Sequence, residues 1–130
     1  MADKDRWERG REMLERVYAG DVVTAPRGAM PFADIMLEQL FAEVWTRTDI
    51  LPIRDRRLLM LGAIVALGEG MTFRIQLKAA LKNQELTPDQ AREILIHMAQ
   101  YAGYPRVAGL VGEVEGVIAE VEKERAASES

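Results

Sequence analysis

Three groups of polar residues in this chain have types and spacings that could support chemistry. The first group is Glu93, His97 and Tyr101, which are spaced four residues apart and would share one face of a helix. A carboxylate one turn from an imidazole favours the protonated imidazole, so this face could donate a proton inside a cleft. The alternative is a solvated or subunit-contact face that happens to include a histidine.

The second group is Arg54, Arg56 and Arg57, at the start of a predicted helix. Helix N-termini attract anions, and arginine binds carboxylates through two hydrogen bonds. A carboxylated substrate could therefore dock here. The alternative is ordinary surface pairing with Asp49 or Asp55.

The third group is Glu69, Thr72 and Gln76, which flank a strongly apolar segment. Near apolar neighbours, Glu69 could have a raised pKa and act as an acid. The alternative is a helix start, in which Glu69 complements the helix dipole and Thr72 falls in the first turn.

The composition excludes several other kinds of chemistry. The chain has no cysteine, so it cannot form disulfides, thiolate zinc sites or cysteine-based peroxidase or protease sites. The two serines, Ser128 and Ser130, lie at the C-terminal end, which disfavours a serine nucleophile. His97 is the single histidine, so no multi-histidine metal site can form, and we expect no cofactor. A net charge of −4 argues against a nucleic-acid partner.

Neither a membrane segment nor a secretion signal is expected. The longest apolar run, residues 58–68, is far shorter than the ~20 residues that cross a bilayer. The first ten residues, MADKDRWERG, are charged and lack an apolar stretch. We therefore expect a cytoplasmic protein that acts away from membranes.

The elements that must position these residues are all predicted to be helical. The chain length of 130 residues suits one domain, 1–130, with a frayed tail at 125–130. Apolar residues recur at helical spacing and predict an all-α bundle of about six helices. These helices are expected at residues 5–18, 31–46, 53–67, 71–82, 88–102 and 104–123.

Two of these helices carry the most specific expectations. The helix with the run 58–68 is apolar on every side, which predicts a central helix buried on every side. The helix at 31–46 is expected to bury an apolar stripe that encloses Gln39 and Glu43 and is formed by Phe32, Ile35, Met36, Leu40 and Val44.

Two further signals concern helix boundaries and packing. Thr87, Pro88 and Gln90 form the signature of a capping box. Three glycines of the last helix, at positions 109, 112 and 116, predict a close helix–helix approach. We favour an interface between subunits for them.

Several segments resemble the carboxymuconolactone decarboxylase family, which is related to alkylhydroperoxidase D. The segments are FAEVWTR at 41–47, RDRRLLMLGAIVALG at 54–68, FRIQLKAAL at 73–81 and LTPDQAREILIHMAQYAGYP at 86–105, with RWERGREMLERVYAGD at 6–21 in support. The resemblance implies an all-α fold and homo-oligomers built from dimers, often hexamers. It also implies a lyase that acts on a small carboxylated or lactone-type metabolite in aromatic compound catabolism.

The chain departs from the relay residues of that family. The peroxidase branch has a Cys-x-x-Cys, a histidine four residues later and a glutamate one helix earlier, and the matching positions here are Glu69, Thr72, Gln76 and Arg57. Thiol-dependent peroxide reduction therefore has no chemical basis in this chain. The decarboxylase branch without the cysteines usually keeps a histidine where Gln76 stands, and glutamine can hydrogen-bond but cannot shuttle a proton.

Other positions match the decarboxylase-like members. Glu43 and Trp45 match a Glu-x-Trp segment, and Glu93, His97 and Tyr101 match a segment common in that branch. The resemblance implies a decarboxylation in which the lactone carbonyl takes up negative charge and a carbon is then protonated. The proton would come from a catalytic residue among Glu69, His97 and Glu43. Substrate-binding residues would be Arg54, Arg56, Gln76, Thr72, Trp45 and Tyr101. The alternative is a diverged family member that serves as a ligand-binding or assembly protein.

Overall fold

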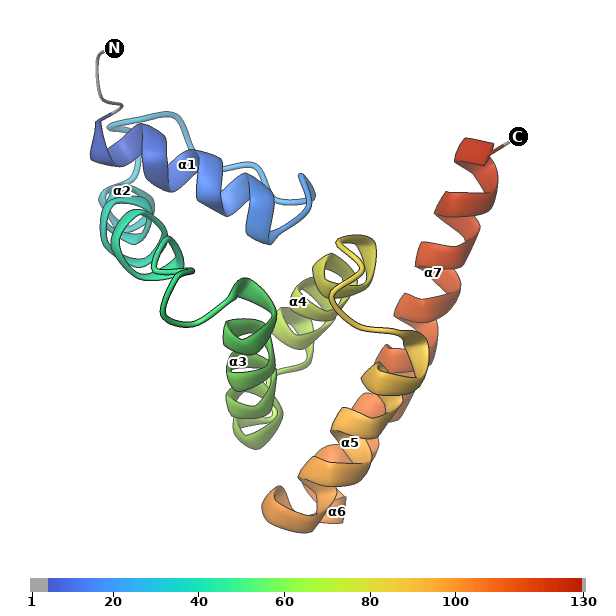
Figure 1. Cartoon of the computed structure of the whole chain (residues 1–130). Coiled ribbons are helices and arrows are strands. Elements are labelled where there is room, and N and C mark those ends of the chain that lie inside the picture. Colours follow the sequence, from blue (N-terminus) through green and yellow to red (C-terminus); the bar gives the residue numbers. More distant parts are fainter. Residues whose placement is uncertain (1–4, 130) are drawn as a thin grey trace. The chain divides into compact units, whose positions relative to one another are not determined.

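A computed structural model of the chain describes residues 5–129, and every regular element in that range is a helix (Figure 1). The predicted all-α class is therefore confirmed. The residues form two compact units, unit 1 (Met1–Arg56) and unit 2 (Arg57–Ser130), which are described separately. No helix within residues 5–129 is both long and apolar enough to cross a membrane.

Unit 1 consists of α1 (Arg6–Val17), α2 (Pro31–Ile35) and a π-helix, η1 (Met36–Trp45), that continues α2. Helix α1 begins where the Asp5 side chain accepts a hydrogen bond from the Glu8 backbone N–H at 2.9 Å. Helices α1 and η1 pack so closely that a Cβ atom on Gly10 would lie 2.0 Å from the Leu37 carbonyl oxygen. The buried side chains of unit 1 include Trp7, Leu14, Val17, Leu37, Phe41 and Trp45.

The predicted helix at 31–46 exists, but the buried face is different from the one expected. Phe32 is 77% exposed and Ile35 is 56% exposed, and Leu40 and Val44 are also exposed. Gln39 and Glu43 are exposed beside them. The residues that pack instead are Ala33, Leu37, Phe41, Ala42 and Trp45. The helix thus has two apolar faces, and contact with α1 decides which one is buried in unit 1.

The boundary between the units falls inside α3 (Ile53–Leu67), and unit 2 begins at Arg57. The other elements of unit 2 are α4 (Gly70–Lys82), α5 (Pro88–Ala102), α6 (Tyr104–Val107), a 3-10 turn η2 (Ala108–Leu110) and α7 (Val111–Glu129). The capping box of α5 is confirmed, with reciprocal hydrogen bonds between Thr87 and Gln90 of 3.0 and 3.1 Å. A core of aliphatic side chains with Phe73 joins α3, α4, α5 and α7.

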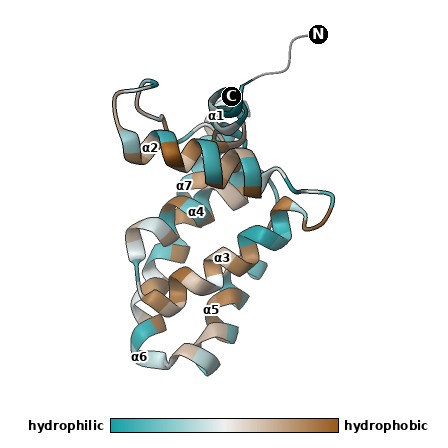
Figure 2. Cartoon of the chain, turned by 90° about the vertical axis from the view of Figure 1, so that its left-hand side faces the viewer, coloured by the Kyte–Doolittle hydropathy of each residue, from teal (hydrophilic) through white to brown (hydrophobic). Residues whose placement is uncertain are grey.

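Helix α3 is buried along one face, which corrects the expectation of a helix buried on every side. Its buried residues are Arg57, Leu61, Ile64 and Val65. Leu59 is 67% exposed and Leu67 is 75% exposed. Hydrophobic residues follow one another along much of α3 (Figure 2). An apolar run in sequence cannot distinguish burial in a core from an apolar surface.

The last predicted helix is divided, and it extends further than expected. Gly103, with φ +95°, ends α5, and the chain returns through α6 and η2 before α7 begins. Helix α7 then runs through residues 125–129, which were expected to be frayed. Arg125 Nη2 donates to the Leu81 carbonyl oxygen at 2.6 Å, and this bond holds the C-terminal turns to α4. Ser130 lies outside the described residues.

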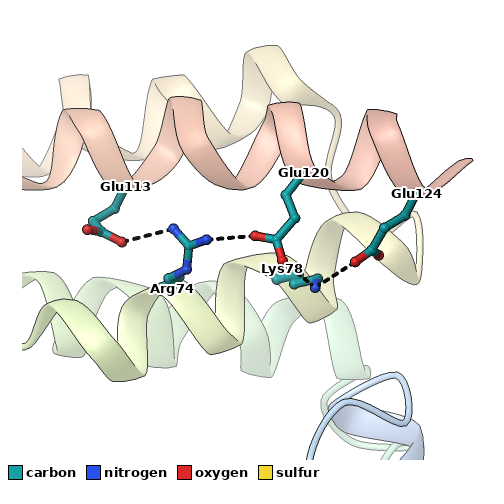
Figure 3. Close-up of polar contacts among 5 residues, drawn as sticks. All are labelled: Arg74, Lys78, Glu113, Glu120 and Glu124. Carbon is teal, nitrogen blue, oxygen red and sulfur yellow. Dashed lines mark hydrogen bonds and ion pairs between the residues drawn. The ribbon is translucent and has the colours of Figure 1, made fainter. Parts of the chain in front are cut away.

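A ladder of ion pairs fixes α4 against α7 (Figure 3). Arg74 contacts Glu113 at 3.3 Å and Glu120 at 2.6 Å. Lys78 contacts Glu120 at 2.8 Å and Glu124 at 3.0 Å. Together with the aliphatic core, these contacts orient the inner face of α4, which carries Gln76.

Candidate functional site

A buried polar cluster lies between α3 and α4. The Arg57 guanidinium is fully buried and donates from Nε and Nη2 to the two carboxylate oxygens of Glu85, at 2.9 and 3.1 Å. Its Nη1 donates to Gln76 Oε1. Asn83 Nδ2 donates to Glu85 at 3.3 Å. Helix α3, helix α4 and the loop before α5 therefore converge on one guanidinium.

The charges of the cluster explain its composition. A buried arginine stays protonated and requires a counter-charge, which Glu85 supplies with a side chain only 10% exposed. Because Arg57 can only donate, it holds the Gln76 amide by its oxygen. Neither Arg57 nor Gln76 can exchange a proton near neutral pH. This cluster can join three segments, but those two residues cannot relay a proton.

The position of Arg57 corrects both sequence-based alternatives for it. Arg57 is neither an accessible anion-binding residue nor a surface partner of Asp49 or Asp55. Glu85 was not a candidate at all. The signal that could have found the cluster is that Arg57 and Gln76 both match relay positions of the family, which should place them in contact.

Glu69 is the N-cap of α4. Its carboxylate accepts hydrogen bonds from the backbone N–H of Met71 at 3.2 Å and of Thr72 at 2.7 Å. Hydrogen bonds from Thr72, first from its side chain and then from its backbone, hold the pKa of Glu69 below its ordinary value. Of the two alternatives for Glu69, the helix start is therefore confirmed and the raised pKa is wrong. Glu69 is exposed, ionised at neutral pH and placed as a cap, so it is poorly suited to donate a proton.

The α5 residues Glu93, His97 and Tyr101 lie on the same face of one continuous helix, as their spacing requires. All three side chains are exposed in the chain. The His97 imidazole packs against the Tyr101 ring, with 5.1 Å between ring centroids and a tilt of 46°. His97 therefore lies at the surface with an aromatic neighbour, accessible to a ligand or to another subunit.

The two remaining arginines of the second group differ in accessibility. Arg54 is exposed and lies 3.9 Å from Asp55. Arg56 donates from Nε to the Leu51 carbonyl oxygen and from Nη2 to the Arg47 carbonyl oxygen, both at 2.9 Å. Arg56 thus fixes the turn before α3, whereas the Arg54 side chain is 45% exposed beside Asp55.

Glu43 and Trp45 lie on η1 in unit 1. Glu43 forms ion pairs with Arg6 at 2.9 Å and Arg9 at 3.4 Å, which connect η1 to α1. Trp45 is 5% exposed and stacks on Phe41 at 6.4 Å between centroids. Trp45 therefore fills the core of unit 1 and has little surface to offer a substrate.

The residues expected around one substrate are thus distributed over two units. Unit 2 brings together three pairs: Gln76 with Arg57, Glu69 with Thr72, and His97 with Tyr101. The others belong to unit 1, namely Glu43, Trp45, Arg54 and Arg56. Within residues 5–129, no three histidine or carboxylate side chains are grouped so that they could hold a metal ion.

Comparison with known proteins places this architecture in a family. Residues 31–116 match the model of the carboxymuconolactone decarboxylase family. The chain is 28% identical over 110 residues to a 4-carboxymuconolactone decarboxylase of Acinetobacter baylyi, and the aligned region covers 81% of each chain. No solved structure is significantly similar to the chain. Since the family match covers more than half of the chain and includes α3, α4 and α5, the protein belongs to the carboxymuconolactone decarboxylase family.

Proposed function

We propose that this protein is a lyase that decarboxylates a small carboxylated or lactone-type metabolite. The observation that carries the proposal is the family match over residues 31–116, supported by the similarity to a 4-carboxymuconolactone decarboxylase. His97 is the proposed proton donor. It is the single imidazole of the chain, and its exposed position on α5 leaves it accessible to a substrate.

The proposed reaction breaks the carbon–carbon bond to the substrate carboxylate. Carbon dioxide leaves, and the electron pair of the broken bond is delocalised onto the lactone carbonyl. Protonation of carbon by the His97 imidazolium then gives the product. The Tyr101 ring, packed against the imidazole, would limit the orientations of His97. Arg54 is proposed separately as a residue that binds carboxylates, because its side chain is 45% exposed.

One observation favours the alternative of a diverged ligand-binding or assembly protein. The resemblance assigns a histidine to the position of Gln76, and here Gln76 is buried and held by Arg57. A glutamine fixed in this way cannot deliver a proton. If the reaction of the relatives depends on a proton donor at that position, this chain would bind the substrate without converting it.

The test is turnover of 4-carboxymuconolactone by the full chain, with carbon dioxide release and substrate loss followed together. We expect release well above the uncatalysed rate. His97→Gln should lower kcat by about a hundredfold or more, since general acid catalysis typically contributes that much. Glu122→Gln, at an exposed position of α7, is the matched control and should leave the rate unchanged.

Each outcome of this assay is informative. Unchanged turnover in His97→Gln would refute the role of His97 while retaining the lyase. Absence of release from folded protein would favour a different substrate or the binding alternative. A thermal-shift screen of small carboxylates would then identify ligands, because a ligand of the native state raises its apparent stability.

We also propose that the protein is a cytoplasmic homo-oligomer built from dimers, up to a hexamer. Large exposed apolar side chains support this proposal, among them Phe32 in unit 1 and Leu67 and Met71 in unit 2. Among the described residues, a Cβ atom on Gly109 or Gly112 would meet no atom within 4 Å outside its chain neighbours and its own helix backbone, so their expected close contact would have to come from another subunit. Light scattering that gives the mass of one chain, 14.6 kDa, would contradict the proposal.

A further inference from the structure

An apolar cavity of about 320 Å³ lies in unit 2 between α5, the α6–η2 segment and α7. Its floor belongs to the aliphatic core, and its mouth is bordered by exposed Ile96, Tyr104 and Val111. The side chains that give it its apolar character are Leu95, Ile96, Ala99, Val107, Val111 and Val114. None of the residues proposed for catalysis lines it.

The local sequence explains why this space is left unfilled by side chains. Gly103 ends α5 with φ +95°, and the short α6 and η2 carry the chain across before α7 begins. Ala99 and Ala108 face the resulting space with side chains that are too small to fill it. The space is open to solvent on one side, so a small ligand could enter it without a change in the fold.

The charged atoms at the cavity are already paired with each other. Arg92 donates from Nε and Nη2 to Glu115 at 2.9 and 3.0 Å, and from Nη1 to Asp89 at 3.1 Å. Inside the pocket, a charged group would have to break this bridge or be buried against aliphatic side chains, and both are unfavourable, so the pocket offers a charge no partner. A neutral apolar ligand would incur neither cost.

We propose that this cavity is a binding site for a small, neutral, mostly apolar molecule with one ring or a short hydrocarbon chain. Small-molecule pockets begin near 300 Å³ and are lined mainly by apolar side chains. The cavity is large enough for one substituted ring. The site is independent of the proposed lyase reaction and would serve an apolar effector or an apolar part of a larger ligand.

The test uses toluene and benzoate, which share a ring but differ in charge. Methyl NMR spectra of the full chain would follow the signals of Leu95, Val107 and Val114 during each titration. We expect saturable shifts with toluene and at least about tenfold weaker binding of benzoate, because burial of a carboxylate without a partner is costly.

Two filling variants and one control complete the test. Ala99→Phe and Ala108→Phe should each weaken toluene binding about tenfold or more, and Ala108→Phe fills the cavity from an exposed position, which protects the fold. Ala119→Phe, on an exposed part of α7 outside the cavity, should bind toluene like the unmodified chain. The proposal would be overturned if the methyl signals show no saturable shifts at the highest toluene concentration used. It would also be overturned if toluene shifts the signals of Ala108→Phe as much as those of the unmodified chain. Methyl signals of these residues that shift with protein concentration but not with toluene would also overturn the proposal, because they would show that a second copy of the chain covers the cavity.

Discussion

Two arginine–glutamate pairs in unit 2 have nearly the same geometry but different burial, so the loss of the glutamate should have different effects. Arg57 and Glu85 form two hydrogen bonds of 2.9 and 3.1 Å, with side chains 0% and 10% exposed. Arg92 and Glu115 form two of 2.9 and 3.0 Å, with side chains 43% and 50% exposed. We expect Glu85→Ala to destabilise the protein strongly and Glu115→Ala to do so only weakly.

The magnitude follows from the burial of the guanidinium. Glu85→Ala removes the carboxylate that accepts hydrogen bonds from Nε and Nη2 of Arg57. The positive charge of the guanidinium then loses its counter-charge at a position that water cannot reach. Removal of one partner from a buried ion pair typically costs about 3–5 kcal/mol. In a chain of this length, 3 kcal/mol lowers Tm by an amount on the order of 10 °C. In Glu115→Ala, by contrast, Arg92 remains hydrated.

The assay is urea unfolding followed by circular dichroism at 222 nm. The double variant Arg57→Met/Glu85→Leu removes both charges and should recover most of the stability lost in Glu85→Ala, because apolar replacements of buried pairs are often neutral. Such a recovery would show that Glu85→Ala loses stability because the Arg57 charge is left unpaired, and not because packing is lost. A loss below about 1 kcal/mol in Glu85→Ala, or equal shifts in Glu85→Ala and Glu115→Ala, would refute the reasoning.

Three further outcomes are expected. Gly10→Ala should destabilise unit 1 by about 1–3 kcal/mol or more, because the new Cβ atom would collide with the Leu37 carbonyl oxygen. The emission of the two tryptophans, both in unit 1, would report this change. Because the folded-state pKa of Glu69 is lowered, its stabilising effect is present above the unfolded pKa near 4.5 and disappears as pH falls through the folded value. The stability difference between the unmodified chain and Glu69→Gln should therefore be greatest at neutral pH and vanish in acid. Gln76→His alone should not increase carbon dioxide release, because the adjacent guanidinium disfavours an imidazolium.

The elements that the sequence predicted best are those with local signals. The capping box at Thr87 and Gln90 depends on residues three positions apart, and α5 has the predicted limits. The segment 36–45 could not be predicted in the same way. Its π-helical hydrogen bonds and its buried face depend on packing against α1, with Gly10 at the closest approach. Because this segment has two apolar faces, its periodicity alone could not identify the buried one.

The candidate site shows the same limit at the level of single side chains. Arg54, Arg56 and Arg57 are nearly equivalent in sequence, and the structure gives each a different environment. Arg54 is exposed, Arg56 binds backbone carbonyl oxygens, and Arg57 is fully buried against Glu85. Spacing along a helix predicts which residues share a face, but a partner 28 residues away in sequence comes only from tertiary packing.

The substitutions at the relay positions are chemically consistent with one another. A glutamate beside a histidine supports an imidazolium, whereas an arginine at the glutamate position opposes it. Glutamine suits the arginine because it offers a neutral acceptor, and Glu85 restores the charge balance that a buried guanidinium requires. The cluster thus holds three segments together at the place where the resemblance puts a proton relay. A decarboxylase built on this chain would need its proton from another group, and His97 carries the one imidazole of the sequence, the side chain most often used for proton transfer in catalysis.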